Sequence, residues 1–164
     1  PLTIDALLQR PFQIWLRDML LQNTKSQRNR ILFELAEADV GQHLCRLHGA
    51  FHLLKGFGCR IAIIQAGLTL VSTVYIKVVS PELIKLHPGL VRNIDRRKEN
   101  QLFVQSLLES CKGTSTQVFA AGVKTRSEWQ TLTESGINGG QGDFFAPSQL
   151  LTGDMKKYSQ RYRV

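Results

Sequence analysis

Short apolar segments alternate with amphipathic stretches along most of the chain. Strands are expected at residues 2–5, 31–35, 60–64, 83–86 and 117–121. Helical spacing of apolar residues is seen at 12–21, 40–54 and 102–108, and Ser127 is the expected N-cap of a last helix. This alternation predicts an α/β fold with a parallel sheet. It fits an open doubly wound sheet as well as a closed barrel.

The length and composition predict one domain. The chain has 164 residues, 43% of them hydrophobic, which is enough to bury a core. Residues 1–152 form the expected domain, and residues 153–164 form a basic C-terminal tail. No apolar run approaches the roughly 20 residues of a membrane-spanning helix, so any membrane anchor is expected upstream. The three cysteines have no CxxC spacing, which favours reduced packing residues in a cytosolic protein.

The chain is basic, with 21 Lys and Arg against 13 Asp and Glu and a net charge of +8. The positive electrostatic field of such a chain favours binding to nucleic acid, an anionic membrane or an acidic protein, and it does not distinguish among these partners. Tyr158 and Tyr162 lie between basic residues of the tail, as suits stacking on single-stranded bases. A solvated helix start and a frayed terminus explain the same residues. The candidate contacts for RNA or a protein partner are Arg92, Arg96, Arg97, Lys98, Lys156, Lys157 and Arg161.

Two histidines, His48 and His52, are spaced four residues apart on the helix expected at 40–54. This spacing can hold zinc, but a third ligand and the glutamate of an HExxH motif are absent. We therefore expect surface or half-buried histidines at these positions.

Six short motifs occur in a fixed order along the chain. They are LTIDA (2–6), FELAE (33–37), AIIQAG (62–67), IKLH (84–87), VFAAGVKT (118–125) and QGDFF (141–145). In this order they resemble the motifs of EAL domains, bacterial phosphodiesterases that hydrolyse cyclic di-GMP. The resemblance implies a TIM-type (β/α)₈ barrel, here without its first β/α unit and without the EAL signature itself.

The resemblance also indicates which residues stand at the family's active-site positions. A two-metal phosphodiesterase needs hard oxygen ligands that hold ions roughly 3.5–4 Å apart. Ile64 has no lone pair to offer, Gln65 has only a neutral oxygen, and Ala121 replaces a glutamate. The sequence therefore predicts no catalytic residue, no metal and no cofactor, and an ion pair between Glu34 and Lys85. The vestigial positions are Asp5, Glu34, Ile64, Gln65, Lys85, His87, Ala121 and Gln141.

The tail and the segment 139–146 resemble a group of degenerate, regulatory EAL proteins. That resemblance implies a non-enzymatic domain that controls RNase E-dependent decay of small regulatory RNAs of the carbon-storage (Csr) system. The implied partner is unphosphorylated enzyme IIA of the glucose phosphotransferase system, and a homodimer is a further expectation. The implied location is the cytoplasmic side of an inner-membrane-anchored bacterial protein. Direct RNA binding through the basic loop and tail, and residual cyclic di-GMP binding or hydrolysis, remain the alternatives.

Overall fold

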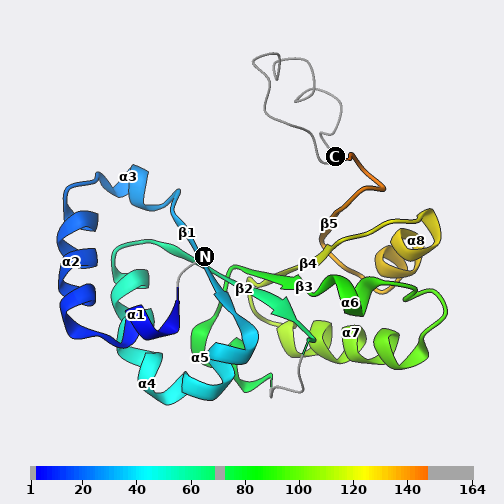
Figure 1. Ribbon diagram of the computed structural model, residues 1–164, viewed down its shortest axis with the longest axis horizontal. Coiled ribbons are helices and arrows are strands. Elements are labelled where there is room, and N and C mark those ends of the chain that lie inside the picture. Colours follow the sequence, from blue (N-terminus) through cyan, green and yellow to red (C-terminus); the bar gives the residue numbers. More distant parts are fainter. Residues whose placement is uncertain (1–2, 69–72, 148–164) are drawn as a thin grey trace, which may run out of the picture.

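Parallel strands and helices alternate in the computed structural model, which describes residues 3–68 and 73–147 (Figure 1). The strands are β1 (Leu32–Ala36), β2 (Arg60–Ala66), β3 (Leu83–Leu86), β4 (Gln117–Ala121) and β5 (Gly139–Gln141). The helices are α1 (Ile4–Leu8), α2 (Arg10–Leu21), α3 (Lys25–Arg28), α4 (Glu37–Gly56), α5 (Val74–Val79), α6 (Pro88–Val91), α7 (Lys98–Cys111) and α8 (Arg126–Glu134). None of the helices in these described ranges is long and apolar enough to cross a membrane.

The strand order separates the two architectures that the sequence pattern left open. The strands form one parallel sheet in the order β1-β2-β3-β4-β5. A doubly wound sheet reverses its strand order at a switch point, whereas the strands of a (β/α)₈ barrel follow one another around the barrel. The unbroken order is that of a barrel segment, and the predicted α/β fold class is confirmed.

The two faces of the sheet differ in burial. One face carries fully buried apolar side chains that join the hydrophobic core, among them Leu35, Ile63, Ile84 and Val118. Apolar residues of α4, α5, α7 and α8 belong to the same core, and Figure 1 shows α4, α5 and α7 along the lower side of the sheet. Side chains of the opposite face, which includes Glu34, are mostly half-buried. This second face is the one that a barrel turns inward.

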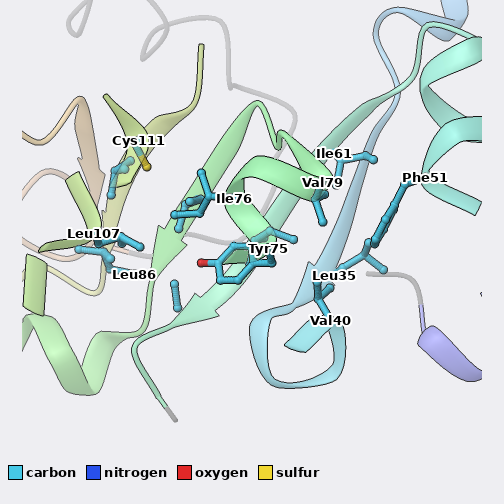
Figure 2. Close-up of a cluster of buried hydrophobic side chains, with 14 of the residues drawn as sticks. Leu35, Val40, Phe51, Ile61, Tyr75, Ile76, Val79, Leu86, Leu107 and Cys111 are labelled. Atoms are coloured by element: carbon cyan, nitrogen blue, oxygen red, sulfur yellow. The ribbon is translucent and has the colours of Figure 1, made fainter. Parts of the chain in front are cut away.

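Among the residues that the structure describes, Tyr75 is the largest fully buried side chain. Figure 2 shows it in the cluster that also contains Leu35 of β1, Leu86 of β3 and Leu107 of α7. Its hydroxyl group donates a hydrogen bond of 2.7 Å to the carboxylate of Glu37, as a buried tyrosine requires. The short helix α5 was not predicted from the sequence, and it supplies this anchor.

Residues 2–5 were wrongly predicted to form a strand. Thr3 is extended, but Ile4 to Leu8 form helix α1, and Leu2 lies outside the described residues. Ile4 and Leu7 are three positions apart and both are buried, which is helical spacing. A short apolar run is ambiguous without its packing partner, and here that partner is α4.

The N-cap of α8 was also assigned to the wrong residue. Thr125, and not Ser127, is the N-cap, and its hydroxyl group accepts a hydrogen bond from the backbone N–H of Glu128. The Glu128 carboxylate in turn accepts from the N–H of Thr125, which completes a capping box. The stop predicted after the long helix is confirmed: α4 ends at Gly56, and Gly58 has a φ of +80°.

Candidate functional site at the carboxyl ends of the strands

Most of the vestigial positions lie at one edge of the sheet. Glu34 and Lys85 lie within β1 and β3, and the others lie at or just beyond the carboxyl end of a strand. These others are Ile64 and Gln65 on β2, His87 after β3, Ala121 on β4 and Gln141 on β5. The carboxyl ends of parallel strands are where α/β folds bind ligands, so this edge is the candidate site.

Asp5 is the exception. It is exposed in the first turn of α1, not at the end of a strand. A carboxylate in the first turn stabilises a helix through its macrodipole, which is a sufficient physical reason for an acid at this position. Asp5 therefore does not lie in a strand, as the strand predicted at residues 2–5 had placed it.

Glu34 and Lys85 form an ion pair that crosses the middle strand of three. Lys85 Nζ donates to Glu34 Oε1, and each side chain is about one-quarter exposed. Ala62 of β2 is in register with Glu34 and with Leu83, so a small side chain lies under the pair. The ion pair expected from the sequence is therefore present, and the carboxylate of Glu34 is neutralised by an ammonium group.

The end of β2 is irregular where the sequence carries Ile64 and Gln65. The register between β2 and β3 shifts between Ile63 and Ala66, and Gln65 has a φ of +59°. A left-handed conformation in a residue that is not glycine is uncommon and marks a locally constrained backbone. The exposed Gln65 side chain therefore sits on a bulge at the edge where the candidate residues gather.

A pocket opens between the ends of β3 and β4, with a volume of about 340 Å³. Its lining residues are His87, Pro88, Gly89, Arg92, Gly122 and Lys124. His87 is the N-cap of α6, and its Nδ1 accepts a hydrogen bond of 3.0 Å from the N–H of Gly89. Its lining residues include an arginine, a lysine and a histidine but no carboxylate, while most of the lining surface is apolar; the pocket is named the basic pocket after these three residues.

A buried glutamate fixes both sides of this pocket. Glu128 is 3% exposed, and its carboxylate accepts hydrogen bonds from the N–H groups of Asn93, Lys124 and Thr125 at 2.8, 2.8 and 3.0 Å. Burial opposes its charge, but these hydrogen bonds outweigh burial and lower the pKa of Glu128. Sequence reasoning missed this residue, although Thr125-x-x-Glu128 is a capping-box signature.

A second buried carboxylate, Glu37, links the start of α4 to the end of β2. It accepts hydrogen bonds from the N–H of Gly67 at 2.8 Å and from the Tyr75 hydroxyl at 2.7 Å. Burial raises the pKa of Glu37, although both hydrogen bonds oppose that rise. Glu37 was not singled out from the sequence, and only its packing distinguishes it from an ordinary first-turn acid.

Four of the candidate basic contact residues lie within the residues that the structure describes, and three lie outside them. Arg92, Arg96, Arg97 and Lys98 are all exposed, and Arg96 approaches Asp95 at 3.6 Å. The tail candidates Lys156, Lys157 and Arg161 lie outside the described residues.

The two histidines considered as metal ligands, His48 and His52, are exposed on α4. Within residues 3–68 and 73–147, no group of three or more His, Cys, Asp or Glu is placed to hold a metal ion.

Comparison with known proteins identifies the family. Residues 1–148 match the family described as EAL domain. The chain belongs to the EAL domain family. It is 63% identical over 162 residues, 99% of its length, to the RNase E specificity factor CsrD of Escherichia coli strain K12. The family resemblance drawn from the sequence motifs is thus confirmed, as is the particular similarity to CsrD.

Solved EAL structures agree with the fold. The calcium and cyclic di-GMP complex of Klebsiella pneumoniae BlrP1 is similar with a TM-score of 0.74 and 28% identity, over 86% of this chain and 36% of that one. The FimX EAL domain of Xanthomonas citri, in complex with cyclic di-GMP, has a TM-score of 0.76 and 19% identity, over 92% of this chain and 59% of that one. The second likeness bears on the fold alone. The EAL domain described here spans about a quarter (25%) of the length of the CsrD relative.

Proposed function

We propose that the chain is a non-catalytic EAL domain that acts in regulated RNA decay by binding a protein partner. The observation that carries this proposal is the 63% identity, over 99% of the chain, to an RNase E specificity factor. The proposed partner is unphosphorylated enzyme IIA of the glucose phosphotransferase system. The RNAs whose decay is regulated would be small regulatory RNAs cleaved by RNase E. The EAL domain would be the domain of the regulatory protein that binds enzyme IIA.

The residue types at the strand ends support the absence of phosphodiesterase activity. Two-metal hydrolysis requires several hard oxygen ligands around a shared water. Glu34 is paired with Lys85, while Ile64, Gln65 and Ala121 offer no carboxylate. A lone, neutralised carboxylate does not assemble a bridged pair of divalent ions. We therefore expect no metal-dependent turnover of cyclic di-GMP above that of a Glu34→Ala variant.

An exposed apolar face on α2 supports protein binding. Leu16 and Leu20 anchor the helix in the core, while Trp15 is 54% exposed and Ile14 44% exposed. The ring of Phe12 lies 5.4 Å from that of Trp15, and Met19 extends the same surface. Exposed apolar side chains on one helix, with an aromatic among them, are typical of protein interfaces. We take Ile14, Trp15 and Met19, named here the α2 patch, as the proposed contact for enzyme IIA.

Such an interface would respond to the phosphorylation state of the partner. A phosphoryl group brings a charge of about −1.5 to −2, and placing it against apolar side chains carries a desolvation cost. Unphosphorylated enzyme IIA would therefore bind and the phosphorylated form would not. Because the contact is largely apolar, its affinity should change little with salt concentration.

Calorimetric titration of the chain with both forms of enzyme IIA tests this proposal. We expect binding of the unphosphorylated form only, and a loss of affinity of at least tenfold in a Trp15→Ser variant, since an interfacial tryptophan typically contributes ~2 kcal/mol or more. Leu102→Ser is the matched control, because Leu102 is 65% exposed on α7, away from α2. Equal binding of both forms of the partner, or equal effects of the two variants, would contradict the proposal.

A further inference from the structure

A second pocket lies at the amino ends of the strands, at the opposite edge of the sheet from the candidate site. It has a volume of about 270 Å³, and Lys55, Arg60, Ser80, Glu82 and Ser115 supply polar side chains to its lining. We propose that this amino-end pocket is a modification site, at which the ε-amino group of Lys55 is acylated by an acyl phosphate. The inference does not depend on the protein partner proposed above.

The amino group of Lys55 is held at the wall of the amino-end pocket. Lys55 lies in the last turn of α4, and its Nζ donates a hydrogen bond of 3.0 Å to the backbone carbonyl oxygen of Ser80. Ser80 is the C-cap of α5 and also lines the pocket. The hydrogen bond therefore fixes Nζ between two lining residues, while the side chain of Lys55 remains accessible from the solvent.

Lys55 has no carboxylate partner among the residues that the structure describes. Lys85, by contrast, forms an ion pair with Glu34. The carboxylate in the pocket lining, Glu82, is occupied by Arg60, whose Nε donates to it at 2.7 Å. A carbonyl oxygen accepts a hydrogen bond from a neutral amine as well as from an ammonium group, so the contact that Lys55 makes does not require its positive charge.

A lysine amine and a cysteine thiol both line the pocket, and burial acts on them in opposite ways. Burial lowers the pKa of Lys55, so a larger fraction of its amine is neutral and carries the lone pair that attacks a carbonyl group. Burial raises the pKa of the Cys59 thiol, which disfavours the reactive thiolate. The amine of Lys55 is therefore the nucleophile that an acylating agent in this pocket would meet.

The proposed reaction transfers an acyl group from a phosphate oxygen to nitrogen. The lone pair of the neutral Nζ attacks the acyl carbon, a C–N bond forms, and the bond between that carbon and the phosphate oxygen breaks. The electron pair of the broken bond leaves with the phosphate, which also takes up the proton released by the amine. Arg60 and the Ser115 hydroxyl line the same pocket and can donate hydrogen bonds to the phosphate.

Acylation would change the end of α4. The product is an uncharged amide, so Lys55 would no longer place a positive charge at the carboxyl end of the helix, where the macrodipole favours one. The acyl group would also occupy the pocket beside the hydrogen bond to Ser80, which joins the end of α4 to the end of α5.

Incubation of the whole chain with acetyl phosphate, followed by peptide mass spectrometry, tests the proposal. The initial rate of acetylation at a pH of about 8 is measured at Lys55 and at Lys98, which is exposed at the start of α7 and does not line the amino-end pocket. Lys55 should react at least roughly fivefold faster than Lys98, because its neutral fraction is larger and the pocket holds the donor.

Two variants test the role of the pocket. Ser115 is exposed, so Ser115→Phe can fill the cavity without disturbing the core, and it should slow acetylation of Lys55 by roughly threefold or more. An Arg60→Gln/Glu82→Gln variant removes a lining ion pair without changing the net charge. It should slow the reaction of Lys55 with acetyl phosphate but not with acetic anhydride, which has no phosphate. In both variants Lys98 is the internal control and should react at the wild-type rate.

Three results would overturn the proposal. Equal rates at Lys55 and Lys98 would show that exposure alone decides which lysine is acetylated. An unchanged rate at Lys55 in Ser115→Phe would show that the acyl donor does not enter the pocket. If the Arg60→Gln/Glu82→Gln variant changed the rates with the two reagents equally, the pocket would not recognise the phosphate of the donor.

Discussion

Replacement of Glu128 by glutamine tests how the candidate site is held together. The Glu128 carboxylate is 3% exposed and accepts three backbone hydrogen bonds, from Asn93, Lys124 and Thr125. It therefore joins the loop after α6 to the loop before α8. Glutamine has nearly the same shape but only one acceptor oxygen, and its amide nitrogen would face N–H groups that are themselves donors.

The size of the effect follows from these contacts. Oε1 accepts from Asn93, while Oε2 accepts from Lys124 and Thr125, so glutamine loses at least one of the three hydrogen bonds. A hydrogen bond to a charged group contributes about 1.5–3 kcal/mol, and a buried donor without a partner costs about 1–3 kcal/mol. We expect a loss of unfolding free energy of about 2–4 kcal/mol. In a domain of this length that lowers the melting temperature by about 6–12 °C.

Urea denaturation of wild type and variant measures this loss, with an unchanged slope as evidence that only stability has altered. Glu134→Gln is the control, because Glu134 is on the same helix but exposed, where Gln130 Nε2 donates to it at 2.9 Å. The control should change stability by less than about 0.5 kcal/mol. Equal effects of the two substitutions would refute the assignment of Glu128 as the link between the two loops.

The pH dependence provides an independent check. Because the pKa of Glu128 is lower in the folded chain than its ordinary value of 4.5, ionised Glu128 stabilises the fold at neutral pH. That stabilisation is complete above the unfolded pKa and is lost as the pH falls through the folded pKa. The difference between wild type and Glu128→Gln should thus be constant near neutrality and shrink below a pH of about 4.5. A difference that stays constant down to a pH of about 3 would mean that the charge is not what matters.

Two further experiments test the backbone at Gly142 and the ion pair between Glu34 and Lys85. Alanine at Gly142 would place Cβ in steric conflict with the Val123 carbonyl oxygen, whereas alanine at Gly136 meets nothing within 4 Å. Gly142→Ala should therefore cost more than ~3 kcal/mol in urea denaturation and Gly136→Ala only ~1 kcal/mol, and similar losses would contradict the geometry. A double-mutant cycle with Glu34→Gln and Lys85→Met should give a coupling energy of about 1 kcal/mol, since both side chains are partly exposed. A coupling energy of zero would show that the pair has no energetic role.

The pattern of the sequence was sufficient for most of the secondary structure that builds the sheet. The strands at Leu32–Ala36 and Arg60–Ala66 and the long helix between them follow from local apolar spacing, and the helix ends at the predicted glycine. The resemblance of the sequence motifs to those of EAL domains also implies that Ile64, Gln65 and Ala121 stand where the family carries acids. These conclusions need no contact between distant residues, which is why the sequence could supply them.

Other features required the tertiary structure because they depend on residues far apart in the chain. The segment around Asp5 became a helix when Ile4 and Leu7 packed near α4, although its local sequence suited a strand. The strand order, which separates a barrel segment from a doubly wound sheet, is a property of long-range pairing. The basic pocket exists only because the segments after β3 and β4 bring His87 and Lys124 to one cavity, and because Glu128 joins the loop after α6 to the loop before α8. The local periodicity of apolar residues carries no information about such long-range contacts, because they depend on which surfaces of distant segments pack against each other.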